Sequence, residues 1–255
     1  MSQIPEDHPR YQSLVTRERI VGGVESGITS VKGLIAQGRG EAFDYLIGEC
    51  TIPSARAAER VAAAMLLRAG TPVISVNGNA AALVPAELVK LSVLLGAPLE
   101  VNLFYRTEER VLKIIEHLKA HAARQVLGAN PDVSIPGLSS ERGRVCSEGI
   151  YSADVVFVPL EDGDRCEALV DMGKQVIAVD LNPLSRTARY ATVPVIDNIT
   201  RAVPNIINSV SELKEYPEVY LNEIVEDYDS KKGLDAALET MCRNLMEHSR
   251  SQLIT

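Results

Sequence analysis

The stretch VIAVDLNPLSRTARYATVPVIDNI, residues 176–199, decides the fold class of this chain. Residues 176–179 are apolar and mostly β-branched, as expected for a strand inside a parallel sheet that is covered on both faces. A polar loop, a short helix and a second apolar strand, residues 193–196, follow. Because ligands bind at the carboxyl ends of the strands in open α/β sheets, the pattern predicts a binding site at the ends of these two strands.

The residues that follow the two strands are polar and partly cationic. They are Asp180, Asn182, Ser185, Arg186, Thr187 and Arg189 after the first strand, and Asp197 and Asn198 after the second. Asp and Ser at such positions are also ordinary helix caps, which is the alternative explanation. Capping gives no reason for two arginines, whose guanidinium groups suit phosphates and carboxylates. The loop therefore favours a pocket for a small anion.

The composition limits the class of protein and of partner. The chain has 255 residues, of which 46% are hydrophobic and 24% charged, and a net charge of −8. These values are typical of a globular protein, and no apolar run approaches the ~18 residues of a membrane span. The polar start MSQIPEDHPRYQ has no secretory signal, so we expect a cytoplasmic protein. An acidic chain also argues against nucleic acid or a membrane surface as partner.

Predicted strands and helices alternate along the middle of the chain. Strands are expected at residues 73–76, 99–105, 125–127 and 150–159, and helices at 53–69, 85–95 and 107–120. This order predicts a three-layer, Rossmann-like α/β fold with a mostly parallel sheet, N-terminal helices and a C-terminal amphipathic helix. We divide the chain into an N-terminal helical segment, 1–50, an α/β core, 51–210, and a C-terminal helical appendage, 211–255, within one compact domain.

Two stretches outside this series are candidates for ligand contact. A short helix is expected at residues 31–36, followed by Gly38-Arg39-Gly40, which is interpreted as the start of the next helix, where glycine lets the backbone approach a ligand. A plain turn is the alternative. The other stretch is the Pro-, Gly- and Ser-rich loop at 129–149, since loops of this length are usually lids, binding loops or partner contacts.

The familiar catalytic motifs are missing. No GxGxxG, GxxxxGK[ST], GxSxG or HExxH occurs, and the four cysteines form no CxxC pair. Cys166 has no histidine near it in the sequence to support a catalytic thiol. Glu161, Asp162 and Asp164 surround a glycine beside Arg165, which suits either a ligand such as a cation or a helix start capped by Asp164.

Six segments together resemble a known family. They are IPEDHPRY, GLIAQGRGEAFDYLIGE, PVISVNGNAAALVP, EVNLFYRTEER, EGIYSADVVFVPLEDGDR and VIAVDLNPLSRTAR. In order and spacing they are similar to archaeal 4-phosphopantoate--β-alanine ligases, also called phosphopantothenate synthetases, from about residue 4 to about 207. Gln37 stands where that family is expected to have histidine and Cys166 where it is expected to have threonine, so neither is assigned a shared role.

The resemblance implies an ATP-dependent ligase of coenzyme A biosynthesis. It would join (R)-4-phosphopantoate to β-alanine and release AMP and diphosphate, as a magnesium-dependent homodimer. On matching positions, the residues implied for ATP are Arg17, Arg39, Asp180, Leu181, Asn182, Arg186, Thr187, Asn198 and Ile199. No magnesium ligand is assigned. A kinase for a small hydroxy acid and a non-enzymatic nucleotide sensor are the alternatives.

The roles in catalysis are our own hypothesis. An acyl-adenylate would form while Arg39 and Arg186 neutralise charge, and Asp162, Asp164 or Glu161 would accept the proton of the β-alanine amine. Asn77, Asn79 and Arg106 stand at the ends of other predicted strands and are expected to position the pantoate substrate.

Overall fold

The computed structural model describes residues 4–8 and 10–252 of the chain. Its main sheet has six strands in the order β3-β2-β1-β6-β7-β8, and all neighbours pair in parallel. The strands are β1 Pro72–Val76, β2 Leu99–Val101, β3 Val126–Leu127, β6 Val155–Pro159, β7 Gln175–Val179 and β8 Val193–Val195. The prediction of a mostly parallel sheet is confirmed.

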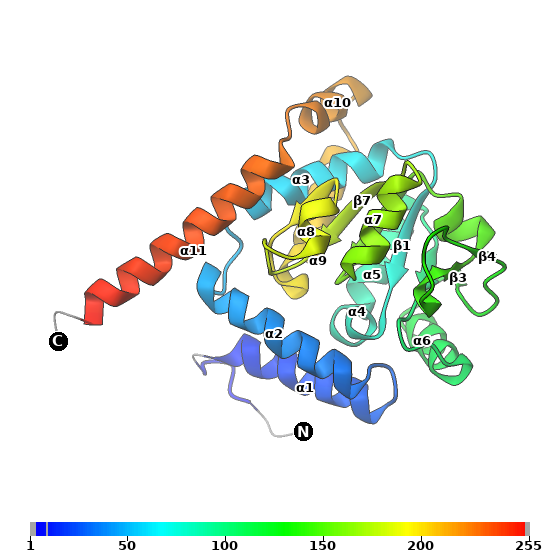
Figure 1. Ribbon diagram of the computed structural model, residues 1–255, viewed down its shortest axis with the longest axis horizontal. Helices are drawn as coiled ribbons and strands as arrows, with labels where there is room; N and C mark the ends of the chain where they lie inside the picture. The colour runs from blue at the N-terminus through cyan, green and yellow to red at the C-terminus, as the bar shows by residue number, and fades with distance from the viewer. Residues whose placement is uncertain (1–3, 9, 253–255) are drawn as a thin grey trace.

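Helices cover both faces of this sheet (Figure 1). Along β6 and β7, Phe157 and Ile177 belong to one buried cluster with α3, α5, α6 and α9, whereas Val156 and Val176 belong to another with α7. Successive side chains of a strand point to opposite faces, so this division gives the three layers that the sequence predicts. The helices are α3 Pro53–Arg68, α5 Pro85–Leu95, α6 Glu108–Ala120 and α9 Ile199–Leu213 in one layer, and α7 Gly163–Asp171 with the neighbouring α8 Arg186–Tyr190 in the other.

The strand order places a crevice at one edge of the sheet. From β1 the chain continues outward to β2 and β3, and it then returns to β6 on the opposite side of β1 before it continues to β7 and β8. The loops after β1 and β6 therefore leave the sheet in opposite directions. Ligands of open α/β sheets bind at such a reversal point.

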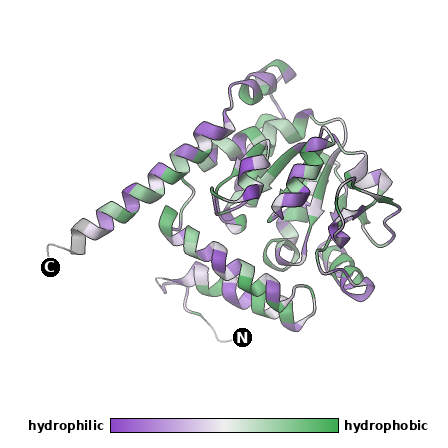
Figure 2. Cartoon of the chain, in the orientation of Figure 1, coloured by the Kyte–Doolittle hydropathy of each residue, from purple (hydrophilic) through white to green (hydrophobic). Residues whose placement is uncertain are grey.

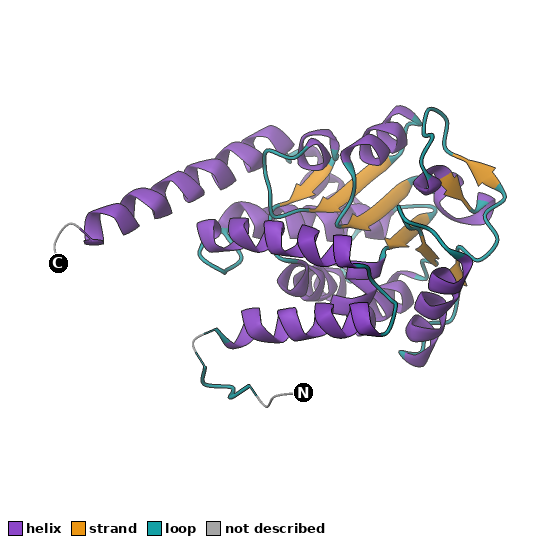
Figure 3. Cartoon of the chain, turned by 60° about the horizontal axis from the view of Figure 1, so that its bottom comes forward, coloured by secondary structure: helices purple, strands orange, loops and turns teal. Residues whose placement is uncertain are grey.

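Two antiparallel helices, α1 Tyr11–Glu25 and α2 Val31–Ile47, lie side by side before the sheet begins (Figures 1 and 3). The predicted helix end at residue 36 is wrong, as are both the new helix start and the alternative turn at 38–40, because α2 continues through Gly38 and Gly40. It ends at Gly48, whose left-handed backbone, φ 86°, stops the helix. Glycine inside a helix costs ~1 kcal/mol, but α2 packs Phe43, Leu46 and Ile47 against other elements, and this burial outweighs the cost.

The chain ends in α10 Glu218–Glu226 and α11 Ser230–Gln252. Near its start, α11 buries Ala237 and Met241 against α2 and α3, and its later turns extend away from the sheet (Figures 1 and 3). Hydrophobic and hydrophilic residues alternate along it, whereas the strands are almost uniformly hydrophobic (Figure 2). The amphipathic C-terminal helix is confirmed, and the division into three segments stays a prediction. No helix within residues 4–8 and 10–252 has the length and apolarity needed to cross a membrane.

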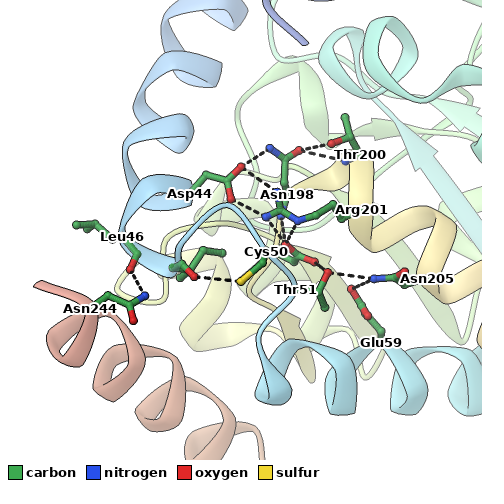
Figure 4. Close-up of polar contacts among 12 residues, drawn as sticks. Asp44, Leu46, Cys50, Thr51, Glu59, Asn198, Thr200, Arg201, Asn205 and Asn244 are labelled. Atoms are coloured by element: carbon green, nitrogen blue, oxygen red, sulfur yellow. Dashed lines mark hydrogen bonds and ion pairs between the residues drawn. The ribbon is translucent and has the colours of Figure 1, made fainter. Parts of the chain in front are cut away.

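One buried acid of α3 makes the stability of the fold dependent on pH. Glu59 is 1% exposed and accepts a hydrogen bond from Asn205 (Figure 4). The Asp197 carboxylate also lies near it. Burial, reinforced by the Asp197 carboxylate, raises the pKa of Glu59 to about 8 from 4.5. Between these two pH values the folded chain holds a proton that the unfolded chain has lost. The free energy of unfolding therefore falls as pH rises through this window.

We expect Glu59→Gln to remove this pH dependence, since an uncharged amide takes the place of the protonated carboxyl. At pH 5 the variant and the original chain should unfold at similar temperatures. At pH 8 the variant should be more stable, by ~2 kcal/mol or more. Thermal unfolding at both pH values measures the difference, with the exposed Glu215→Gln as control. The same pH trend in Glu59→Gln and the original chain would contradict the assignment.

Candidate functional site

A cavity of about 700 Å³ opens at the carboxyl end of the sheet. Its walls come from the loops after five strands and from the side of α2 that faces them. The lining residues include Asn77, Gly78 and Asn79 after β1, Leu103, Phe104 and Tyr105 after β2, Leu160, Glu161, Asp162 and Gly163 after β6, Asp180, Leu181, Asn182, Ser185, Arg186 and Thr187 after β7, and Asn198 and Ile199 after β8. The loops after β7 and β8, which were selected from the sequence, thus line the same cavity.

The residues after β1 hold the cavity wall together. Asn77 Nδ2 donates to the carbonyl oxygens of Leu160, at 2.5 Å, and Pro159, and so joins the ends of β1 and β6 at the reversal point. Its Oδ1 caps the short helix α4, Gly78–Leu83. Asn79 Nδ2 donates to the Gly33 carbonyl oxygen of α2, 2.8 Å away. Both asparagines line the cavity while their amides fix the surrounding backbone.

The loop after β7 is organised by its own side chains. Asp180 accepts hydrogen bonds from the Asn182 N–H, at 2.9 Å, and from the Ser185 hydroxyl, and Ser185 in turn caps α8. Burial raises the pKa of Asp180, which these donors oppose. The Asp180 N–H also donates to the carbonyl oxygen of Val195 in β8, so the two loops leave the sheet side by side. A loop held in this way can bind a ligand without first being ordered.

The acids after β6 have three different environments. The Glu161 side chain is 1% exposed and is paired with both Arg165, itself fully buried, and Arg142, 2.6 Å away. Asp162 lines the cavity and forms an ion pair with Arg142 Nε at 2.8 Å. Burial raises the pKa of Asp162, although the Arg142 charge opposes this shift. Asp164 is exposed and accepts from the Arg165 N–H. Of the three acids, Asp162 is the one suited to exchange a proton with a bound molecule.

The long loop at 129–149 is held against the sheet. It contains β4 Val133–Ser134, η1 Glu141–Gly143, β5 Arg144–Val145 and the first residues of η2 Ser147–Tyr151. The buried Glu100 carboxylate of β2 accepts from the N–H groups of Cys146 and Ile150, and Asn102 donates to the carbonyl oxygen of Arg142. These contacts present the Arg142 side chain to the cavity, so the loop forms part of the cavity wall.

Three cations of the cavity were not selected from the sequence: Lys32 of α2, Arg110 of α6 and Arg142. Arg110 is oriented by the carbonyl oxygens of Ile28 and Tyr105. Burial lowers its pKa, and the nearby Arg142 charge lowers it further, so the two guanidinium groups repel each other unless an anion lies between them. The sequence feature that could have identified Arg110 is its position shortly after the predicted strand at residues 99–105.

The structure brings together most of the residues selected from the sequence. Those that line the cavity are Arg39, Asn77, Asn79, Glu161, Asp162, Asp180, Leu181, Asn182, Ser185, Arg186, Thr187, Asn198 and Ile199. Arg189 and Asp197 lie outside the residues lining it, as do three others. Arg17 pairs with Glu41 at 2.8 Å, Arg106 donates to the Gly128 carbonyl oxygen, and Asp164 faces solvent.

The family model for phosphopantothenate/pantothenate synthetase matches residues 54–244, which include all five loops around the cavity and the strands of the main sheet. The chain belongs to this family. A 4-phosphopantoate--beta-alanine ligase of Methanosarcina mazei is 56% identical over 245 residues, which cover 96% of both chains. The protein of the same name from Thermococcus onnurineus is 56% identical over 239 residues, which cover 93% of this chain and 92% of its own.

In this member of the phosphopantothenate/pantothenate synthetase family, Cys166 is unsuited to act as a nucleophile. It is fully buried in α7, and its Sγ lies 3.6 Å from the Thr187 carbonyl oxygen. Burial raises the pKa of its thiol to about 12, with a further contribution from Glu161. Since the thiolate is the reactive form, the thiol is inert at neutral pH.

Proposed function

We propose that this chain joins (R)-4-phosphopantoate and β-alanine to 4′-phosphopantothenate in coenzyme A biosynthesis, with conversion of ATP to AMP and diphosphate. The observation that carries the proposal is the 56% identity, across nearly the whole chain, to relatives named as this ligase. The cavity supports it, because its cations are numerous and come from separate elements. The substrates carry four phosphate groups in all, and arginine binds such groups well.

The nucleotide is assigned to the side of the cavity formed by the loops after β7 and β8. Arg39 and Arg186 line this side, and within the described ranges Arg39 takes part in no ion pair, so its charge is available to a phosphate. Backbone groups near Leu181 and Ile199 are assigned to adenine. Arg17, held by Glu41 in this structure, would have to change partners to reach the nucleotide.

The phosphate of phosphopantoate is assigned to Lys32, Arg110 and Arg142 on the other side of the cavity. An anion between Arg110 and Arg142 would remove the repulsion that lowers the pKa of Arg110. Asn77 and Asn79 follow β1, which lies between β2 and the pair β7 and β8 in the sheet, and both line the same cavity. This arrangement would direct the pantoate carboxylate towards the nucleotide.

Two displacements make up the proposed reaction. The pantoate carboxylate oxygen attacks the α-phosphorus of ATP, the bond to diphosphate breaks, and Arg39 and Arg186 stabilise the negative charge that develops. The β-alanine nitrogen then attacks the acyl carbon, and AMP leaves with the electron pair of the carbon–oxygen bond. Asp162 accepts the proton of the amine, because it is the acid of the 161–164 segment that faces the cavity with a raised pKa.

The proposal includes Mg2+, a homodimer and a cytoplasmic location. The described parts of the chain contain no group of three or more His, Cys, Asp or Glu side chains suited to a metal ion. Mg2+ does not require such a group, because it usually retains waters and binds through substrate phosphates with one or two carboxylates. For a homodimer, Val31 and Ile35 of α2, each 61% exposed, provide apolar surface.

Product analysis tests the function. Purified chain is incubated with ATP, Mg2+, 4-phosphopantoate and β-alanine, and every product is identified. We expect 4′-phosphopantothenate, AMP and diphosphate in equal amounts. ADP formed without β-alanine would instead indicate a kinase, and ATP binding without turnover would indicate a nucleotide sensor.

Arg186→Ala should lower kcat/KM for ATP by ~10²–10³-fold, because one cation that stabilises charge in the transition state is lost. Arg186 is 60% exposed and pairs with Glu167, so the fold should be unaffected. Steady-state kinetics at saturating phosphopantoate and β-alanine measures the loss. The matched control is Arg189→Ala on the same helix, outside the cavity lining. Equal activity of the two variants would remove Arg186 from the site.

A further inference from the structure

A buried polar network connects α2 to the loop after β8 (Figure 4). Asp44, in the last turn of α2, accepts hydrogen bonds from Asn198 Nδ2 at 2.7 Å and from the guanidinium group of Arg201. Arg201, in the first turn of α9, also donates to the Asp197 carboxylate, and Asp197 accepts from the Thr51 hydroxyl at 2.6 Å. One guanidinium group therefore bridges two carboxylates from elements more than 150 residues apart in sequence.

The side chain of Asn198 is engaged within the protein. Its Nδ2 donates to Asp44, and its Oδ1 accepts from both the N–H and the hydroxyl of Thr200, at 3.1 and 2.9 Å. Its own N–H donates to Asp197 at 2.7 Å. These contacts orient the first turn of α9, where N–H groups have no partner within the helix. Asn198 therefore shapes the wall of the cavity that it lines.

The same contacts determine where α2 lies. Asp44 is 6% exposed and Asp197 1%, so both charges depend on Arg201 for compensation. Arg39 stands on α2 little more than one turn before Asp44, and α2 and Asn198 line the same cavity. A shift of α2 away from α9 would separate Arg39 from the loops after β7 and β8. It would also leave the Asp44 carboxylate buried without its partners, which is costly.

We propose that Asp44, Arg201 and Asn198 are positioning residues that set the distance between α2 and the loop after β8, and thereby the affinity for the nucleotide. This inference rests on the proposed function, because it takes the anion at this side of the cavity to be ATP. Their effect is indirect: Arg39 and backbone groups near Ile199 are the groups assigned to the nucleotide, and the side chains of the three residues hold these groups in register.

The test compares three variants. Asp44→Ala removes the acceptor of both Asn198 and Arg201, whereas Asp44→Asn retains the shape and an acceptor oxygen without the charge. Arg60→Met is the matched control, because Arg60 also connects to α9, through Glu212 at 2.9 Å, but lies on α3 outside the cavity lining. For each variant we measure the Kd for ATP with Mg2+ by calorimetry, KM for ATP and for β-alanine, kcat, and Tm.

Asp44→Ala is expected to raise the Kd and KM for ATP about tenfold or more, with less than about a twofold change in KM for β-alanine. Asp44→Asn should have a smaller effect in the same direction, and Arg60→Met should leave the ATP affinity unchanged even if Tm falls. Should Asp44→Ala not fold, Asp44→Asn decides the question.

The outcomes separate this inference from the function. Unchanged ATP affinity in the folded Asp44 variants, or equal losses for both substrates, overturns the positioning role alone, because it leaves ligase activity of the original chain in place. An original chain that makes no 4′-phosphopantothenate but binds ATP overturns the function, and the calorimetric comparison still decides the role of Asp44. An original chain that binds no ATP overturns both.

Discussion

Arg142→Met is expected to lower kcat/KM for 4-phosphopantoate by ~10²–10³-fold, mainly through a higher KM. The side chain of Arg142 is 9% exposed and is held by Glu161 and Asp162, so it meets the cavity in a fixed geometry. Methionine fills a similar volume without the charge. The substrate phosphate would then lose one of three assigned cations, and the Asp162 carboxylate would lose its partner.

The matched control is Arg144→Met, two residues further along the same loop. Arg144 is 52% exposed and pairs only with Glu141 among the described residues, so its loss should leave KM unchanged. Arg142→Met will also lower the stability of the fold, by less than the ~3–5 kcal/mol of a fully broken buried ion pair, because Arg165 still compensates Glu161. Kinetics well below the Tm of each variant separates the two effects. A KM for phosphopantoate that stays normal in Arg142→Met would exclude Arg142 from the phosphate site.

Asp162→Asn is expected to lower kcat by ~10²–10⁴-fold, because the amide cannot accept the proton of the β-alanine amine. The pH dependence makes the prediction specific. Burial raises the pKa of Asp162 above its ordinary 3.8, so the base is lost to protonation at a higher pH than for an exposed aspartate. The activity of the original chain should fall on the acidic side as Asp162 takes up its proton. The residual activity of Asp162→Asn should lack this fall.

Asp164→Asn is the control for this experiment, because Asp164 carries the same group two residues away and is exposed. Asp164→Asn should retain the kcat of the original chain and the same fall of activity at acidic pH. Pre-formed acyl-adenylate gives a second measurement, since Asp162→Asn should slow its reaction with β-alanine and leave its formation from ATP less affected. If Asp164→Asn and Asp162→Asn lose activity equally, the proton acceptor lies elsewhere.

The parallel sheet and the loops after β7 and β8 could be predicted from the sequence because the signals are local. An uninterrupted β-branched run such as residues 176–179 needs cover on both faces, and the caps Ser185 and Asn198 mark helix starts directly after a strand. Both features depend on residues within a few positions of one another. The cavity lining around Asp180 and Asn198 therefore agrees with the prediction.

Predictions made from neighbouring residues were wrong or incomplete where contacts between residues far apart in the chain determine the structure. In isolation, Gly38 and Gly40 favour a turn, yet the apolar face of α2 and the contact of Asp44 with α9 keep the helix continuous. The acids of residues 161–164 look alike in sequence, but Glu161 is buried between Arg142 and Arg165, whereas the Asp162 side chain is 44% exposed at the cavity. Neither arrangement can be inferred from spacing along the chain.

The sequence by itself determined the three-layer fold and the edge of the sheet at which the cavity opens, because apolar periodicity and helix caps act over a few residues. Only the tertiary structure decided which cations meet there, since Lys32, Arg110 and Arg142 come from a helix, another helix and a loop that are far apart in the chain. A charge faces a cavity or solvent according to what packs around its side chain, and that is settled only when the whole domain has folded.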